Sequence, residues 1–140
     1  MKDFSLQLYS LREVPTLRQR MEIAAQAGYT GVEFAGYDGI AGPEMRRLLA
    51  SLGLRGTGSH IAYDALRDDL DGCVRYCLEA GITSAACPGC EMNDRDQALA
   101  QAEFLEACAE RFGAEGIPFA YHNHAHEFAD AGNGETLFDV

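Results

Sequence analysis

The sequence is poor in positive charge. Its 140 residues include 11 Lys and Arg against 22 Asp and Glu, which gives a formal net charge of −11 at pH 7. The basic residues are scattered along the chain and form no stripe. An acidic chain without a basic surface repels the phosphate backbone of DNA and RNA. We therefore expect no nucleic-acid partner.

Long hydrophobic runs are also missing. Hydrophobic residues make up 47% of the chain, yet no window approaches the roughly 18 uninterrupted apolar residues that a membrane span needs. The opening residues MKDFSLQLYSL contain neither the apolar stretch nor the cleavage site of a secretory signal. We expect a globular protein with a cytoplasmic location and no membrane contact. The length suits a single domain over residues 1–140.

Two common phosphate-binding signatures are absent from the sequence. No G-x-G-x-x-G or G-x-x-x-x-G-K-[ST] pattern opens a helix, which removes the usual sequence support for a nucleotide fold.

The five cysteines are an odd number, and Cys73 and Cys77 are spaced to share one face of a helix. We expect reduced and mostly buried thiols.

One pattern occurs four times: a helical stripe closes with glycine, and an extended apolar run follows. The glycines are spaced 25, 28 and 35 residues apart, as strand-plus-helix units require. Each is expected to end a helix with positive φ. These glycines are Gly28, Gly53, Gly81 and Gly116.

The repeated units predict alternating strands and helices. Apolar residues at helical spacing indicate four helices near residues 17–24, 45–52, 66–77 and 98–112, and strands are expected near residues 4–10, 31–35, 54–59, 82–87 and 117–122. Pro15 and Pro43 suit the first turns of the first two helices, and Asn93 or Asp94 suits the cap of the fourth. The alternation predicts an α/β fold with a parallel sheet. A flavodoxin-like open sheet is the alternative to a barrel.

Polar residues finish the predicted strands. Parallel α/β proteins bind ligands outside the carboxyl ends of their strands, so these side chains are expected at one rim. They are Tyr9 and Ser10, Glu33, Ser59 and His60, Pro88 and Gly89, and His122, Asn123 and His124.

Four stretches carry a resemblance to a known family: LQLYSLRE, GYTGVEFAGYDG, GLRGTGSHIAYDAL and GIPFAYHNHAHEF. In this order and spacing, the sequence resembles the sugar phosphate isomerase/epimerase family of xylose-isomerase-like TIM barrels. A complete barrel needs about 250 residues, and at least about 200. The resemblance therefore implies the N-terminal half of a TIM barrel, with (β/α) repeats that supply five strands and four helices.

The resemblance also implies a function, which is metal-dependent isomerisation or epimerisation of a sugar or sugar phosphate. Such chemistry moves a proton between carbons next to a carbonyl and needs an acid, a base and an electrophile. Family members hold a divalent metal with carboxylates and a histidine from the fifth to eighth strands, so Mn²⁺, Zn²⁺, Mg²⁺ or Co²⁺ is implied. Only the first of these ligands falls within this chain. Glu127 is the implied ligand, and His122 is the alternative.

The remaining site residues take roles by the same resemblance. His122 and His124 are the implied catalytic groups. His60, Glu33 and Asn123 are the implied contacts to substrate, and His124 is also placed to contact a substrate hydroxyl. His126 is left out, because it faces away from its neighbours if the segment stays extended. The competing structural readings are a polar strand end for His60, a supporting carboxylate for Glu33 and a solvated loop after the last strand.

The pair Cys87-Pro-Gly-Cys90 leaves other readings open. C-x-x-C occurs in thiol oxidoreductases, and with His122 and His124 it could form a zinc site. The redox reading lacks a helix that starts directly after the pair, since Glu91, Met92 and Asn93 intervene. A catalytically silent half-barrel or assembly subunit is a further alternative to an enzyme.

Half a barrel predicts an exposed sheet. Both edge strands lack a neighbour, and unpaired edges invite another chain. Barrel interiors are packed with apolar side chains, and an open half would expose part of that face to water. We expect a homodimer on these grounds. The expected inner face comprises Leu6, Leu8, Val32, Phe34, Phe119 and Tyr121.

Overall fold

Five short parallel strands form one sheet in the computed structural model, which describes residues 3–140. The sheet order follows the chain, and each strand pairs with the one before it. A flavodoxin-like sheet changes direction at a switch point, so the sequential order excludes that alternative and confirms the partial TIM barrel. The strands are β1 (Ser5–Gln7), β2 (Gly31–Ala35), β3 (Arg55–His60), β4 (Ala85–Cys87) and β5 (Phe119–Tyr121).

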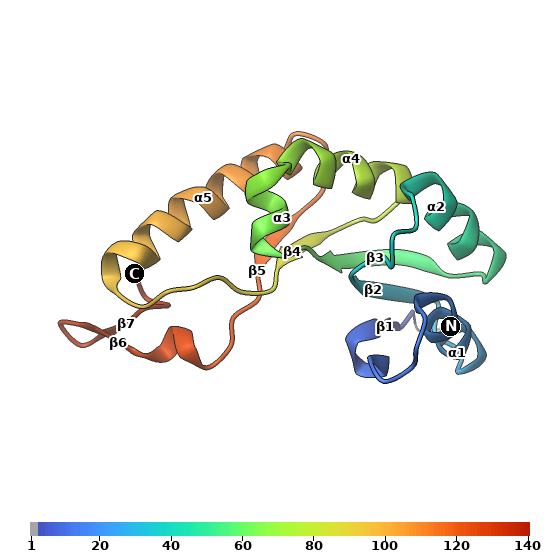
Figure 1. Cartoon of the computed structure of the whole chain (residues 1–140), viewed down its shortest axis with the longest axis horizontal. Coiled ribbons are helices and arrows are strands. Elements are labelled where there is room, and N and C mark those ends of the chain that lie inside the picture. Colours follow the sequence, from blue (N-terminus) through green and yellow to red (C-terminus); the bar gives the residue numbers. More distant parts are fainter. Residues whose placement is uncertain (1–2) are drawn as a thin grey trace.

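Helices cover the convex side of the sheet, and the other side is open (Figure 1). The α-helices are α1 (Leu17–Gln26), α2 (Gly42–Ser51), α3 (Tyr63–Asp68), α4 (Leu70–Ala80) and α5 (Arg95–Gly113). The four glycines at the repeated junctions all have positive φ, as predicted. No helix in the described part of the chain has the length and apolar character to cross a bilayer.

The helix starts only partly follow the prediction. Thr16 caps α1 with a capping box, so Pro15 precedes the helix instead of lying in its first turn. Pro43 does lie in the first turn of α2. Asp94, and not Asn93, caps α5 by accepting a hydrogen bond from the backbone N–H of Gln97 at 2.8 Å.

The predicted number of four helices was wrong, because two helices, α3 and α4, take the place of the expected third helix. Asp69 ends α3 with non-helical backbone angles, φ −154° and ψ 72°. Its carboxylate accepts from the backbone N–H of Gly72 at 2.9 Å and thereby caps α4. A residue that favours helix caps thus divides one apolar stripe between two helices.

The first strand is shorter than predicted. It ends at Gln7, and Leu8–Leu11 form the 3₁₀ helix η1. The Gln7 side chain caps this turn by accepting from the backbone N–H of Tyr9 at 2.5 Å. Tyr9 and Ser10 therefore leave the sheet plane and do not finish a strand.

The expected inner face was wrong. Val32 and Phe34 are fully buried in the core under the helices, and Phe119 stacks on Phe112 of α5 at 5.2 Å between ring centroids. Strand neighbours alternate between faces, so the residues between them face the open side. That side carries small and polar residues, which include Ser5, Gln7, Gly31, Glu33, Gly58 and His60.

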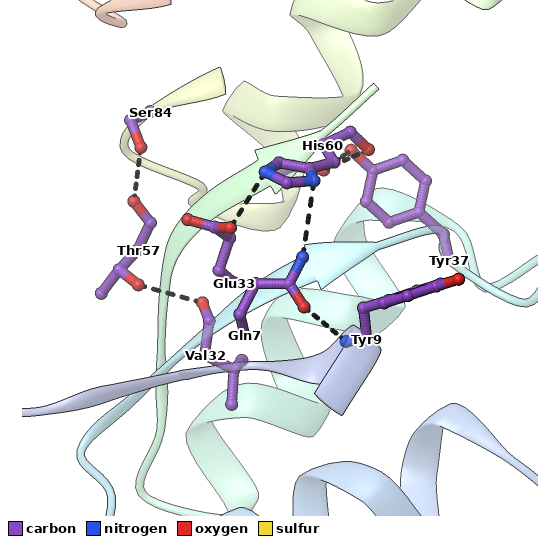
Figure 2. Close-up of polar contacts among 9 residues, drawn as sticks. Gln7, Tyr9, Val32, Glu33, Tyr37, Thr57, His60 and Ser84 are labelled. Carbon is purple, nitrogen blue, oxygen red and sulfur yellow. Dashed lines mark hydrogen bonds and ion pairs between the residues drawn. The ribbon is translucent and has the colours of Figure 1, made fainter. Parts of the chain in front are cut away.

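A β-bulge at Thr57 decides which side His60 faces. Val32 pairs with Gly56, but Glu33 pairs with Gly58, so β3 contains one extra residue. Thr57 Oγ1 donates to the carbonyl of Val32 at 3.1 Å, and Ser84 Oγ donates to the carbonyl of Thr57 at 2.7 Å, as Figure 2 shows. The bulge places His60 on the open side.

The same bulge turns Ser59 into the core, where its hydroxyl bonds to that of Tyr37 at 2.7 Å. Ser59 is therefore not a rim residue, although the sequence places it at a strand end.

A hairpin that the sequence did not reveal follows the last parallel strand. After the 3₁₀ helix η2 (His126–Phe128), β6 (Asp130–Gly132) pairs with β7 (Glu135–Thr136). The hairpin returns the chain to η2, where the backbone N–H of Phe138 donates to the carbonyl of Glu127 at 2.8 Å. Leu137 is buried beside this contact.

Candidate functional site

A cleft of about 710 Å³ lies on the open side, at the carboxyl ends of the strands. It brings together Glu33 from β2, His60 from β3, and His122 and His124 from the segment after β5. The sequence predicted these four as site residues, and the fold places them around one space. The other lining residues are Gln7, Tyr9, Ser10, Arg12, Ala35, Gly36, Ala62 and Pro88.

His60 lies between two polar partners in the sheet (Figure 2). Its Nε2 is 3.2 Å from Glu33 Oε1, and its Nδ1 is 3.4 Å from the amide nitrogen of Gln7. The three side chains come from β3, β2 and β1, so pairing of adjacent strands sets their spacing. Glu33 therefore lines the cleft and also contacts a side chain of the neighbouring strand. Its position is compatible both with a contact to substrate and with the role of a supporting carboxylate.

The surroundings of His60 disfavour its charged form. Burial lowers the pKa of the imidazole, and the positive charges that His122 and His124 can carry act in the same direction. The carboxylate of Glu33 acts the other way but does not outweigh these effects. The pKa of His60 therefore lies below its ordinary value of 6.5.

The histidine rings form a row along the cleft. The ring centroids of His60 and His122 are 4.8 Å apart, and those of His122 and His124 are 4.9 Å apart. The backbone N–H of His122 donates to the carbonyl of Cys87 at 2.9 Å, which extends the β4–β5 pairing by one residue. His122 is thereby fixed by the sheet, whereas His124 lies on the loop beyond.

Glu127 is fully buried and does not line the cleft. Its Oε1 accepts from the hydroxyl of Tyr121 at 2.5 Å, and its Oε2 accepts from the backbone N–H of His124 at 2.8 Å. Burial pushes the pKa of this carboxyl upward, but the bonds from Tyr121 and His124 and the proximity of His126 outweigh it and hold the pKa below 4.5. Glu127 is thus a buried carboxylate with two donors.

His126, which the sequence analysis left out, also lies beside Glu127. Its Nδ1 is 3.4 Å from Glu127 Oε2, and its Nε2 is 3.2 Å from the carbonyl oxygen of Cys90. The segment turns into η2 here, so the assumption of an extended chain was wrong. Within residues 3–140, the metal-ligating side chains that cluster are His124, His126 and Glu127, whose ligand atoms lie within 4.8 Å of one another.

Asn123 and the C-x-x-C pair lie outside the cleft. Asn123 is exposed, and its amide donates to the carbonyl of His124 at 3.3 Å, so its contact with substrate stays a prediction. Burial raises the pKa of the Cys87 and Cys90 thiols above the ordinary value, which disfavours the thiolate that redox chemistry needs. All five cysteines are free.

Two polar lining residues, Gln7 and Arg12, were not predicted from the sequence. Gln7 was read as part of an apolar strand, although its position opposite Glu33 follows from the strand register. Arg12 follows η1, and its guanidinium carbon lies 4.9 Å from the centroid of the Tyr9 ring. Both belong to the LQLYSLRE stretch, and an alternation of faces along this strand was the available signal for Gln7.

Comparisons with known proteins show the fold of the chain. No protein-family profile and no curated protein matches it. Among solved structures, a sugar phosphate isomerase/epimerase from Parabacteroides distasonis matches with a TM-score of 0.81 at 19% identity, over 99% of this chain and 64% of its own. An AP endonuclease of family 2 from Brucella melitensis matches at 0.70 and 22%, over 86% and 55%.

A third structure, a D-psicose 3-epimerase in the presence of D-fructose, matches with a TM-score of 0.64 at 14% identity, over 91% of this chain and 56% of its own. Xylose-isomerase-like barrels are also among the matches. At these identities the likeness concerns the fold. The chain spans 53–64% of the length of the isomerase and epimerase structures that it matches. Its fold is that of part of a xylose-isomerase-like TIM barrel.

Proposed function

We propose that the chain carries one side of the active site of a sugar or sugar-phosphate isomerase or epimerase. The supporting observation is that Glu33, His60, His122 and His124 come from separate strand ends and line one cleft. Proton acceptors and donors of this kind suit the transfer of a proton between two carbons beside a carbonyl. Neighbours of the same fold are described as sugar isomerases and epimerases.

The residues divide by their surroundings. His122 and His124 are the proposed acid and base, because their rings face the cleft without a carboxylate partner of their own within it. Glu33 is the proposed contact to a substrate hydroxyl, and His60, whose ring nitrogens face Glu33 and Gln7, takes part through Glu33. Arg12 is the one permanent cation among the lining residues of the described chain, so it is the proposed contact for the phosphate of a phosphorylated sugar.

A divalent cation is part of the proposal. Glu127 and His126 lie in a group with His124 whose ligand atoms are within 4.8 Å of one another. With His124 kept as acid or base, they offer a carboxylate and an imidazole, donors that suit Mn²⁺, Zn²⁺ or Co²⁺ and, through oxygen, Mg²⁺. When bound, the cation would polarise the carbonyl of the sugar. Glu127 is the proposed ligand because it is a buried carboxylate, and a cation would replace one of its present donors.

Nucleic acid is a poorer fit to the cleft. One neighbour is described as an AP endonuclease, but this chain has a net charge of −11 and a single permanent cation among the lining residues described here. Contacts to a phosphate backbone rely on several Lys and Arg side chains. A small polyol is therefore the proposed substrate class.

The proposed site draws on strands from outside these residues. In the described sheet, β1 and β5 each pair on one side only, so the strands that would face the cleft from across a barrel are not present in these residues. We propose that a second copy of the chain docks along the free edges of β1 and β5. Such a homodimer is compatible with an active enzyme and also with a catalytically silent half-barrel. The open face carries small and polar side chains, so burial of apolar surface contributes little to this association. Hydrogen bonding between unpaired strand edges is the proposed driving force.

The test of function is exchange of solvent deuterium into a sugar. The chain is incubated with D-fructose or a ketose phosphate and Mn²⁺ in D₂O, and deuterium at the carbon beside the carbonyl is followed by NMR. We expect incorporation that His122→Ala abolishes and His126→Ala, outside the cleft, changes only through the metal. Equal incorporation in all variants would contradict the role of His122, and no incorporation with any sugar and metal would leave the silent half-barrel.

The test of assembly is sedimentation at micromolar concentration. We expect a dimer. The backbone groups of Pro118 and His122 bond to β4, so the N–H of Tyr121 lies on the free side of β5, and Tyr121→Pro, which removes it, should return the dimer to a monomer. The matched control is Tyr121→Ala, which loses the same side chain and keeps that N–H. A well-folded monomer for the unsubstituted chain would contradict the homodimer.

A further inference from the structure

The orientation of the Gln7 amide follows from its partner in η1. The backbone N–H of Tyr9 points at Gln7 Oε1 at 2.5 Å, and a backbone N–H can only donate. The acceptor end of the amide is therefore used by Tyr9. The other end, Nε2, faces Nδ1 of His60 at 3.4 Å.

This orientation dictates the protons of the imidazole. A side-chain NH₂ is only a donor, so Nδ1 of His60 must accept and cannot carry a proton. The remaining ring proton is then on Nε2, where the carboxylate of Glu33 lies at 3.2 Å. A fully protonated imidazole would set two donors against each other at Nδ1. The charged groups that face the ring are Glu33, His122 and His124.

The second oxygen of Glu33 is held on the open side by the shape of β3. A Cβ added to Gly58 would lie 3.0 Å from Glu33 Oε2 and 3.2 Å from Glu33 Cγ. The bulge sets this glycine opposite Glu33, so the carboxylate lies over bare backbone. One oxygen is used by His60, and no donor within the described residues is bonded to the other.

We infer that Gln7 is a positioning residue that fixes His60 as the Nε2–H tautomer, so that His60 holds one oxygen of Glu33 and leaves the other to accept a hydroxyl of the substrate. The chain of contacts runs from Tyr9 N–H through Gln7 and His60 to Glu33 (Figure 2). It makes this wall of the cleft an acceptor of hydrogen bonds. At this place the wall favours a hydroxyl of the substrate over a carboxylate or phosphate group, whereas Arg12 elsewhere in the lining remains the proposed phosphate contact.

The tautomer is measured directly by long-range ¹H–¹⁵N NMR of the whole chain at a pH about two units above the ordinary imidazole value, where the ring is neutral. The signals of His60 are assigned from their loss in His60→Gln. We expect the pattern of a proton on Nε2. A predominant proton on Nδ1 in the unsubstituted chain would overturn the inference without any variant.

Two substitutions test the role of Gln7. Gln7→Met keeps the length and removes the donor, and the ratio of the Nε2–H to the Nδ1–H tautomer should fall roughly five- to tenfold, the factor that one net hydrogen bond supplies. Gln7→Glu presents an acceptor to Nδ1 and should move a proton onto it. Tyr9→Phe keeps the backbone donor and should leave the ratio unchanged. An unchanged ratio in both Gln7 variants would overturn the inference.

The role of the free Glu33 oxygen rests on the proposed function, whereas the tautomer does not. D-fructose is the probe: Glu33→Gln and Gln7→Met should each weaken its binding, the first more than the second. If no sugar binds while the tautomer behaves as expected, the proposed function fails and the assignment of Gln7 stands. If sugar binding is equally strong in Gln7→Met, the positioning role is wrong.

Discussion

Glu33 and Phe34 are neighbours in β2, but they belong to opposite faces of the sheet. Phe34 is fully buried against the helices, whereas Glu33 lines the cleft and contacts His60. The helix-covered face is apolar, and the open face is small and polar. Alternation along each strand thus separates the residues that stabilise the chain from those that form the site. This separation can be tested one residue at a time.

The largest effect is expected from the helix-covered face. Phe34→Ala should lower the free energy of unfolding by about 3 to 5 kcal/mol, because it leaves a cavity in the core. Glu33→Ala, one residue away, should cost less than about 1 kcal/mol, because its partner His60 stays partly solvated. Urea unfolding of both variants is the measurement. Equal losses would contradict the separation of the two faces.

Glu127 is the exception to that separation, because it is a buried charge beside the cleft. Glu127→Gln should lower the free energy of unfolding by about 2 kcal/mol, since one of its donors, Tyr121 or His124, then faces an NH₂ group. Glu135→Gln is the control, because its ion pair with Arg95 is solvated and contributes less than about 1 kcal/mol. Thermal unfolding compares them.

The same two variants bear on the metal. Calorimetry with Mn²⁺ should show weak binding that Glu127→Gln removes and Glu135→Gln keeps. Metal binding of unchanged strength in Glu127→Gln would leave this carboxylate with a purely structural role.

A pair of glycines in β3 sharpens the comparison. Gly58→Ala places a Cβ 3.0 Å from Glu33 Oε2 on the open face, and Gly56→Ala places one 3.1 Å from Ile82 Cγ1 on the other. Each should destabilise the chain by about 1 to 2 kcal/mol. Only Gly58→Ala should shift the NMR signals of His60. A shift of those signals in Gly56→Ala instead would show that the two faces are coupled.

Acidification should have the smallest effect, and its sign follows from His60. Because its pKa is lowered, the folded state binds fewer protons than the unfolded state, so stability is present above 6.5 and falls as the pH drops through that value. Glu127 acts in the same direction below 4.5. In His60→Gln the loss just below 6.5, less than about 1 kcal/mol per pH unit, should disappear. His126→Gln is the control, and urea midpoints at several pH values measure both.

The repeated strand-and-helix units could be predicted from the sequence, because helix-ending glycines and apolar stripes are local signals. Gly53 and Gly81 each follow an apolar helical stripe and have positive φ at the end of that helix. The strands that follow them are arranged in the sheet in the order of the sequence. Glu33 and His60 reach the rim for the same reason. The bulge at Thr57 was missed, although Gly56 and Gly58 lie on either side of it and glycine inside a strand often marks a bulge. The orientation of the open face depends on it.

Other features depend on contacts that a pattern does not contain. The divided helix at Asp69 and the turn after Gln7 arise from single side-chain caps. The burial of Glu127 depends on the hairpin that folds back onto η2. In the sequence, a glutamate after three histidines suggests an exposed ligand, whereas tertiary packing encloses it.

The sequential order of the sheet has a kinetic consequence. Every strand pairs with its predecessor, so each pairing closes only one helix-containing loop. In a complete barrel the first strand also meets the last, and that single contact spans nearly the whole chain. Folding slows as the average separation of contacts grows, and long loops are entropically costly to close. These residues contain the near-neighbour pairings of a barrel without its one distant closure, and we expect them to fold quickly, unit after unit along the chain.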